Sequence, residues 1–107
     1  MPRWLSKVLT RIKALAAARD VRFTLKAFRE LAGLELGLDE EDACEVLAEL
    51  TAEDSAGRIA SVATGEWMYL FKPRVFETIL YVKVILRNDC VVVSLHEDED
   101  GANEDGE

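Results

Sequence analysis

The 107-residue sequence has few of the residues that build disulfide frameworks or zinc sites, since it contains two cysteines and one histidine. Cys44 and Cys90 lie far apart and form no Cys-x-x-Cys motif, so neither kind of site is expected from this chain alone. No apolar run approaches the roughly 18 residues of a membrane-spanning helix, and the start of the chain lacks the apolar core of a secretory signal. We therefore expect a cytoplasmic protein without cofactor, metal or membrane partner.

The composition, with 50% hydrophobic and 32% charged residues, is typical of a soluble globular domain with a real core. A chain of this length rarely divides into two separately packed cores. Residues 98–107 are acidic and contain no hydrophobic residue except one alanine. We therefore expect a single domain over residues 1–97 and a disordered acidic tail over residues 98–107.

The net charge of −8 is unevenly distributed along the chain. Residues 1–29 contain eight Lys or Arg and one acid, whereas residues 30–57 contain ten acids and no base. Residues 97–107 contain seven further acids, so the first 96 residues contain thirteen bases and fourteen acids. A basic surface for an anionic partner therefore remains possible despite the overall charge.

Three helices are expected in the first half of the chain. Hydrophobic residues at three- and four-residue spacing predict an amphipathic helix over residues 5–18, with basic residues between them. Such a helix can lie on an anionic membrane, but packing against a sheet is favoured in a chain this small. Thr24 is a candidate N-cap for a helix over residues 25–32, which follows a short extended connection at residues 21–23.

Asp39 is a candidate N-cap for a third helix that ends near Leu50, with acidic residues in its first turn. Cys44 lies on the apolar face of this helix and is interpreted as a small core residue, not a nucleophile.

The second half of the chain has the two-residue period of strands. Because the strands follow the helices and have short connections, we expect an α+β fold with three N-terminal helices on one face of an antiparallel sheet. Turn-prone residues separate the four expected strands, which are residues 58–63, 67–72, 78–87 and 90–96.

The last two strands are expected to form a hairpin through a two-residue turn at Asn88 and Asp89, because both residue types tolerate positive φ. That turn places Tyr81 opposite His96 and Lys83 opposite Ser94 on the open face. The residues expected to face the core are Leu80, Val82, Val84 and Leu86 in one strand and Val91, Val93 and Leu95 in the other.

Tyr81, His96 and Lys83 would therefore share one patch. Cleavage of RNA without a metal needs a group to accept the proton of the 2′-hydroxyl, a group to protonate the leaving 5′-oxygen, and cations to hold the phosphate. A histidine can transfer protons near neutral pH, a tyrosine can orient or donate, and a lysine can neutralise phosphate. The alternative is that the three are ordinary surface residues of a strand end.

The order of several short segments resembles the motility quorum-sensing regulator (MqsR) family of bacterial toxins. The resemblance covers residues 15–97 in collinear order. The segments that carry it are Val21-Arg22-Phe23-Thr24, Leu36-Gly37-Leu38-Asp39 with Cys44, Trp67, Pro73-Arg74, Leu80-Tyr81-Val82-Lys83 and Val91-Val92-Val93-Ser94-Leu95-His96-Glu97.

The resemblance implies a toxin of a type II toxin–antitoxin system with a RelE-like fold, which cleaves mRNA without a metal. It also implies a cognate antitoxin with a zinc-binding part and a helix-turn-helix part. The active-site tyrosine of the family falls on Tyr81, a lysine of the last strand on His96, and a lysine before the sheet near Arg58. A family glutamine falls on Met68, which cannot hydrogen-bond a base or a phosphate.

The expected catalytic residues are His96, Tyr81 and Arg58. The direction of proton transfer between His96 and Tyr81 stays open. The expected substrate-binding residues are Lys83, Lys72, Arg74 and Met68.

Trp67, Tyr69 and Phe71 alternate along one strand and are expected to pack under the helices, although one of them on the open face could stack an RNA base. Two rival functions are an acidic interaction module that pairs through an exposed sheet edge, and a degenerate toxin homologue that has lost cleavage.

Overall fold

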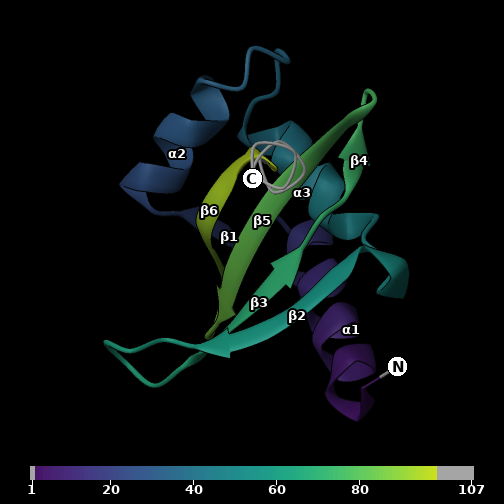
Figure 1. Ribbon diagram of the computed structural model, residues 1–107, viewed down its shortest axis with the longest axis vertical. Coiled ribbons are helices and arrows are strands. Elements are labelled where there is room, and N and C mark those ends of the chain that lie inside the picture. Colours follow the sequence, from purple (N-terminus) through teal and green to yellow (C-terminus); the bar gives the residue numbers. More distant parts are fainter. Residues whose placement is uncertain (1, 99–107) are drawn as a thin grey trace, which may run out of the picture.

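The computed structural model describes residues 2–98 and has an α+β fold, as the sequence predicts (Figure 1). Its helices are α1 (Arg3–Ala17), α2 (Leu25–Ala32) and α3 (Glu40–Ala48), followed by the short 3₁₀ helix η1 (Ala52–Asp54). Its strands are β1 (Val21–Phe23), β2 (Ser55–Ala60), β3 (Trp67–Phe71), β4 (Arg74–Val75), β5 (Thr78–Leu86) and β6 (Cys90–Glu97).

The sheet is mixed and has six strands, which corrects the expectation of an antiparallel sheet of four. Its order is β1-β6-β5-β3-β2, and β4 pairs with β5 outside this path. The segment expected as an extended connection is β1, which pairs in parallel with β6. The Cys90 N–H donates to the Asp20 carbonyl and the Thr24 N–H to the Val92 carbonyl, both at 3.0 Å. A three-residue strand is too short to show a period in the sequence.

The predicted N-caps of α2 and α3 are confirmed. The Thr24 hydroxyl accepts a hydrogen bond from the Ala27 N–H at 3.1 Å. Asp39 accepts from the Asp42 N–H at 2.8 Å, and the Asp42 carboxylate accepts from the Asp39 N–H at 3.0 Å. This reciprocal pair satisfies two of the backbone N–H groups that a helix start leaves without a partner. α3 ends at Ala48, slightly before the predicted Leu50.

The helices pack mainly on one face of the sheet. Figure 1 shows α1 and α3 behind the strands, whereas α2 lies beside β6. The prediction that the helices cover one face of the sheet is therefore confirmed for α1 and α3. α2 lies at the β6 side of the sheet and contributes Ala27 and Leu31 to the core. Ten of the largest fully buried side chains are Phe71, Ile12, Leu47, Leu50, Leu80, Leu95, Val82, Val84, Val92 and Cys90.

The hairpin of β5 and β6 confirms part of the predicted register and corrects the rest. Tyr81 lies opposite His96 and Lys83 opposite Ser94, as expected. Beyond this point the register shifts, because Val84 pairs with Val92 and leaves Val93 as the extra residue of a β-bulge. The loop consequently has three residues, 87–89, where a two-residue turn was predicted. Neither Asn88 nor Asp89 has a positive φ.

The bulge reverses which residues of β6 face the core. A shift of one residue turns every following side chain to the other face of a strand. Cys90 and Val92, expected on the open face, therefore belong to the main hydrophobic cluster. Val91 is buried as predicted, at 3% exposed, but lies outside that cluster, and Val93 is the bulge residue. Burial raises the pKa of the Cys90 thiol to about 12, so this cysteine is chemically inert. Cys44 is buried in α3, as predicted, and burial raises its pKa as well.

The remaining boundaries differ by one or two residues in α1, β3, β5 and β6, and by more in β2. β2 begins and ends three residues earlier than predicted, with a bulge between Ser55 and Gly57. Asp98, assigned to the tail, donates its N–H to the Ile79 carbonyl at 2.8 Å. The rest of the predicted tail, residues 99–107, lies outside the described residues. No helix between residues 2 and 98 has the length and apolar character needed to cross a membrane.

A strained two-residue turn connects β4 to β5. Val75 pairs with Thr78, and the two residues between them have positive φ, 52° at Phe76 and 67° at Glu77. Positive φ at both central positions is the pattern of a type I′ turn, which favours Asn followed by Gly. A bulky residue with positive φ costs free energy, and Phe76 is 71% exposed, so its side chain packs little in compensation.

We predict that replacing the turn by Phe76→Asn together with Glu77→Gly raises the free energy of unfolding by about 1 kcal/mol, because both new residues adopt positive φ with less strain. For a domain of this size, that is a rise of roughly 4–8 °C in Tm. Thermal unfolding by circular dichroism measures it. Asn88→Gly is the control, because Asn88 has no positive φ and should gain nothing. An unchanged or lower Tm for the double variant would contradict this account of the turn.

Candidate active site on the open face of the sheet

Tyr81 and His96 form a stacked pair on the open face of the sheet, the face opposite α1 and α3. They come from directly opposed positions of β5 and β6. Their ring centroids are 5.0 Å apart and the planes make an angle of 21°. The Nδ1 atom of His96 lies 2.9 Å from the Glu97 carbonyl oxygen. When Nδ1 carries a proton and donates it to this carbonyl, Nε2 remains the nitrogen available for proton transfer.

Lys83 lies one pleat along β5 from Tyr81, on the same face of the sheet. Its side chain forms no hydrogen bond or ion pair with another residue between 2 and 98. Its neighbour across the strand pair is Ser94, which is buried and accepts a hydrogen bond from Lys26 Nζ at 2.8 Å. A positive charge beside the stacked rings is what a phosphate group would require.

Glu30 connects α2 to the end of β6. Its Oε1 accepts a hydrogen bond from the Leu95 N–H at 2.9 Å, and its Oε2 accepts one from Lys26 at the same distance. Partial burial raises the pKa of Glu30, but these two hydrogen bonds, with smaller contributions from the charges of Lys26 and His96, outweigh it and lower the pKa. Glu30 therefore stays ionised and helps to hold the strand residue that precedes His96.

Lys72 follows β3 and lies at the same end of the sheet. Its Nζ is 3.6 Å from the Asp98 carboxylate, and its N–H donates to the Asp54 carbonyl at 2.7 Å. Because Phe71 lies opposite Val82, the next residues of the same ladder, Lys72 and Tyr81, are neighbours. Lys72 is therefore positioned beside the stacked pair, with Asp98 as its counter-ion.

Met68 contributes a hydrophobic side chain to the open face. It pairs with Ile59 in β2, and two residues later Leu70 pairs with Lys83. Met68 and Lys83 consequently share this face. The structure thus places Tyr81, His96, Lys83 and Lys72 at neighbouring positions of the sheet. Met68 shares their face, but at the ladder position of Ile85, four residues along β5 from Tyr81.

Arg58 is not with them. It pairs with Tyr69, and Tyr69 pairs with the core residue Val84, so Arg58 faces the helix side of the sheet. Its guanidinium carbon lies 4.7 Å from the ring centroid of Trp4 and 3.8 Å from that of Trp67. The adjacent open-face position in β2 is Gly57, opposite Leu70.

Arg74 lies in β4, opposite Ile79. It lines a separate pocket of ≈ 260 Å³ together with residues of α3 and η1. Ile79 is two residues from Tyr81 along β5, on the side away from Lys83, so Arg74 lies beyond the other end of the stacked pair.

The strand that contains the three aromatic residues behaves mostly as predicted. Phe71 is fully buried, and Tyr69 packs against the core with its ring 5.6 Å from that of Trp4. Trp67, however, is 44% exposed. Sequence reasoning did not find Lys26 and Glu30, whose four-residue spacing on α2 is a signal for a helical ion pair but not for its position beside β6.

Comparison with known proteins supports one family. The family model described as "Motility quorum-sensing regulator, toxin of MqsA" matches residues 6–97. The chain is similar to the mRNA interferase toxin MqsR of Escherichia coli (strain K12), with 30% identity over 90 residues. The match covers 83% of this chain and 90% of the relative.

We predict that Glu30→Ala lowers the free energy of unfolding by about 1–3 kcal/mol, because the Leu95 N–H loses its acceptor. Glu30→Gln keeps an acceptor oxygen and should lose less. The pKa of Glu30 is lower in the folded than in the unfolded protein, so ionised Glu30 stabilises the fold when the pH is above the unfolded-state pKa. This stabilisation is lost as the pH falls through the folded-state pKa.

The stability gap between the wild type and Glu30→Gln should therefore be present at neutral pH and shrink below roughly pH 4. Urea unfolding at neutral and acidic pH measures this gap. A gap that grows on acidification would contradict the assignment.

Proposed function

The chain belongs to the family of motility quorum-sensing regulators that are toxins of MqsA, and from this premise we propose that it is an endoribonuclease that cleaves mRNA without a metal ion. The observation that carries the proposal is the Tyr81–His96 pair, stacked at 5.0 Å with Lys83 one pleat away. This pair combines groups that move protons with a cation on an accessible face of the sheet.

In the proposed reaction the 2′-oxygen of a ribose attacks the adjacent phosphorus, and the bond from phosphorus to the 5′-oxygen breaks. The products are a 2′,3′-cyclic phosphate and a free 5′-hydroxyl, so one proton leaves the 2′-hydroxyl and one reaches the 5′-oxygen. His96 acts as general acid or general base, and Tyr81 is its partner. The charge that builds on the phosphate is stabilised by Lys83.

Lys72 is the second cation of the proposed site. Its ion pair with Asp98 has to open when a phosphate takes the place of the carboxylate. The phosphate then replaces the carboxylate as the charged partner of Lys72, which compensates for the lost ion pair. Met68 then borders the substrate through apolar contact, so the choice of base at this position depends on shape and not on a hydrogen bond.

The partners of this function are mRNA and a cognate antitoxin, for which we propose the type with a zinc-binding part and a helix-turn-helix part. A protein that acts on mRNA works in the cytoplasm. No cofactor takes part in the proposed chemistry, because the proton transfers and the charge stabilisation are assigned to side chains of the chain itself.

The test is incubation of the purified protein with a long natural mRNA in excess EDTA, with the new ends mapped by primer extension. We expect discrete cuts by the wild type. His96→Ala should lower the cleavage rate by roughly 100-fold or more, because it removes a proton-transfer group. Tyr81→Phe keeps the ring and removes only the hydroxyl, and it should lower the rate by about tenfold or more.

Arg29→Ala is the matched control, because Arg29 is an exposed base of α2 outside the proposed site. It should cut like the wild type. Circular dichroism verifies that each variant is folded. Intact RNA with the wild type, or equal cutting by His96→Ala and Tyr81→Phe, would refute the proposal and favour a binding module that pairs through the exposed edge of β2.

A further inference from the structure

A second group of side chains, on the helix side of the sheet, has features of a nucleic-acid surface. Arg58 lies between two tryptophans, with its guanidinium carbon 4.7 Å from the ring centroid of Trp4 and 3.8 Å from that of Trp67. We call these three residues the tryptophan–arginine stack. Such cation–π contacts hold a guanidinium group in a fixed plane beside an aromatic ring.

The stack is accessible at the edge of the sheet. Arg58 belongs to β2, the last strand of the sheet order on that side, and Trp67 is 44% exposed. Arg58 forms no ion pair with a carboxylate in the part of the chain that the structure describes. Both a ring surface and an arginine charge are therefore available to a ligand.

The acid next to the stack is already neutralised. Glu66 precedes Trp67 and binds Arg87 through two hydrogen bonds of 2.9 and 2.8 Å. The Arg87 guanidinium lowers the pKa of Glu66 to about 2, so the ion pair persists over the physiological range. An anionic ligand at Trp67 is consequently not repelled by a free Glu66 carboxylate, because Arg87 neutralises its charge.

A basic stripe on α1 continues the same surface. Arg3, Lys7 and Arg11 are four residues apart and therefore lie on one side of the helix, next to Trp4. None of the three forms an ion pair with another described residue, although the chain has 21 acids. Arg11 Nη2 instead donates to the Arg87 carbonyl at 2.7 Å.

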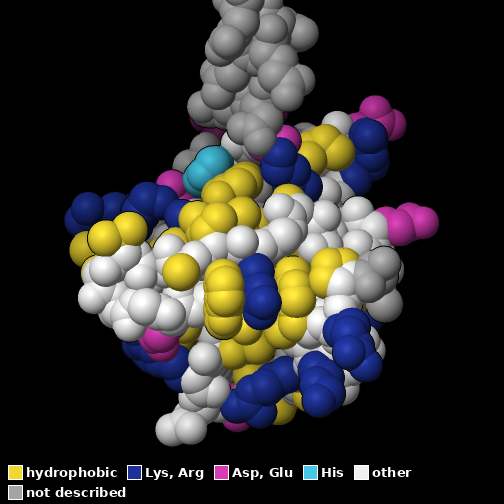
Figure 2. Space-filling view, turned by 60° about the horizontal axis from the view of Figure 1, so that its bottom comes forward, with side chains coloured by type: hydrophobic (Ala, Val, Ile, Leu, Met, Phe, Trp, Pro, Cys, Tyr) yellow, Lys and Arg dark blue, Asp and Glu magenta, His cyan; other side chains and the backbone are white. Residues whose placement is uncertain are grey.

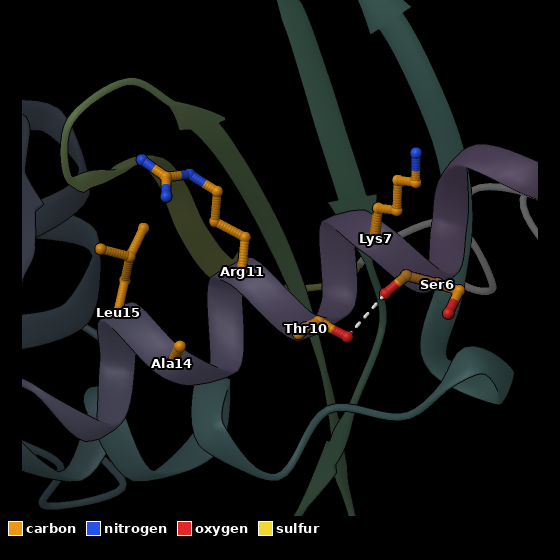
Figure 3. Close-up of a pocket in the computed structure, with 6 residues that line it drawn as sticks. All are labelled: Ser6, Lys7, Thr10, Arg11, Ala14 and Leu15. Atoms are coloured by element: carbon orange, nitrogen blue, oxygen red, sulfur yellow. Dashed lines mark hydrogen bonds between the residues drawn. The ribbon is translucent and has the colours of Figure 1, made fainter.

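The stripe borders a shallow hollow along α1. Figure 3 shows Lys7 and Arg11 projecting from the same side of the helix, with Arg11 directed at the loop between β5 and β6. The hollow has a volume of ≈ 480 Å³. Figure 2 shows Lys and Arg side chains gathered around hydrophobic ones on this face, with few acidic side chains between them.

We propose that the tryptophan–arginine stack and the basic stripe of α1 together bind a single-stranded segment of the RNA that flanks the cleaved bond. Bases stack on the exposed ring of Trp67, one phosphate contacts the charge of Arg58, and further phosphates lie along Lys7 and Arg11. This inference rests on the proposed RNA substrate but uses none of the proposed catalytic residues. The bound strand reaches the open face by passing over the edge at β2.

The chemistry of this surface favours RNA over an acidic protein. Carboxylates of a peptide need only the charges of Arg3, Lys7 and Arg11, whereas planar bases also use the exposed aromatic ring of Trp67. A double-stranded RNA would offer its phosphates but keep its bases stacked in the helix, so it would engage the stripe without the stack.

The sequence supplies its own probe, because its two tryptophans are Trp4 and Trp67. Their fluorescence therefore reports on the stack alone. The ligand is a single-stranded 2′-O-methyl RNA of mixed sequence, roughly 12 nucleotides long. It lacks the free 2′-hydroxyl that the proposed reaction needs, so binding is measured without cleavage. We expect saturable quenching that weakens as the salt concentration rises.

Three variants separate the parts of the surface. Arg58→Ala should weaken binding by about tenfold, and Arg58→Lys, which keeps the charge but loses the planar group, should weaken it less. Lys7→Ala should weaken binding by about threefold and reduce the salt dependence. Arg29→Ala removes one exposed base of α2 and should bind like the wild type.

Each result decides the proposal. Absence of quenching at low salt, equal weakening by Arg29→Ala and Arg58→Ala, or equally tight binding of polyglutamate would overturn it, and the last result would indicate an acidic protein as the occupant. Normal thermal unfolding of Arg58→Ala excludes loss of folding as the cause of weak binding. Failure of the nuclease proposal looks different, because intact mRNA with the wild type can coexist with strong quenching by the 2′-O-methyl RNA.

Discussion

The pairing of β5 with β6 is the constraint on which the rest of the structure depends. These two strands lie at the centre of the sheet, with β1 on one side and β3 on the other. Their inner residues, Leu80, Val82 and Leu95, are at most 2% exposed and contact the layer of helices. Because side chains alternate along a strand, burying these residues places Tyr81, Lys83 and His96 on the opposite face. The hydrophobic core and the proposed active site are therefore two consequences of one register.

The bulge at Val93 allows the same hairpin to place His96 opposite Tyr81 and also to bury Cys90 and Val92. Below it, the register keeps His96 opposite Tyr81, and above it, Cys90 and Val92 turn into the core. Without the extra residue, one of these two sets would face the wrong side. The stretch of β6 above the bulge is also where β1 pairs, through Cys90, Val91 and Val92. The insertion thus separates the part of the strand that serves the core and β1 from the part that carries His96.

Charge in this small acidic chain is segregated by face and not merely by sequence. The acids of α3 lie near its N-terminus, where they complement the helix dipole, and Arg19 pairs with Glu41 and Glu45. Glu66 and Asp89 are each held by an arginine, and these contacts lower the pKa of both carboxyls. The bases of α1 have no such partners among the described residues. An anionic polymer can therefore approach one part of a surface that is negative overall.

Features that depend on neighbours in the chain were predictable from the residues alone. The caps at Thr24 and Asp39 were predictable because a cap acts within three residues, and the alternation of β5 was visible because nine consecutive residues show it. The opposition of Tyr81 and His96 was also correct, since the true loop is one residue longer and the bulge compensates for it.

Features that depend on contacts between distant segments could not be predicted from the sequence. The pairing of β1 with β6, the hydrogen bond of Lys26 with Ser94 and that of Glu30 with Leu95 all join residues more than sixty positions apart. Arg58 illustrates the same limit, because its face follows from its pairing with Tyr69 and from that of Tyr69 with the core residue Val84. No local sequence pattern shows which face of the sheet Arg58 occupies. The face of Arg58 depends on which side of the sheet is buried against the helices, and that burial is a property of the whole sheet.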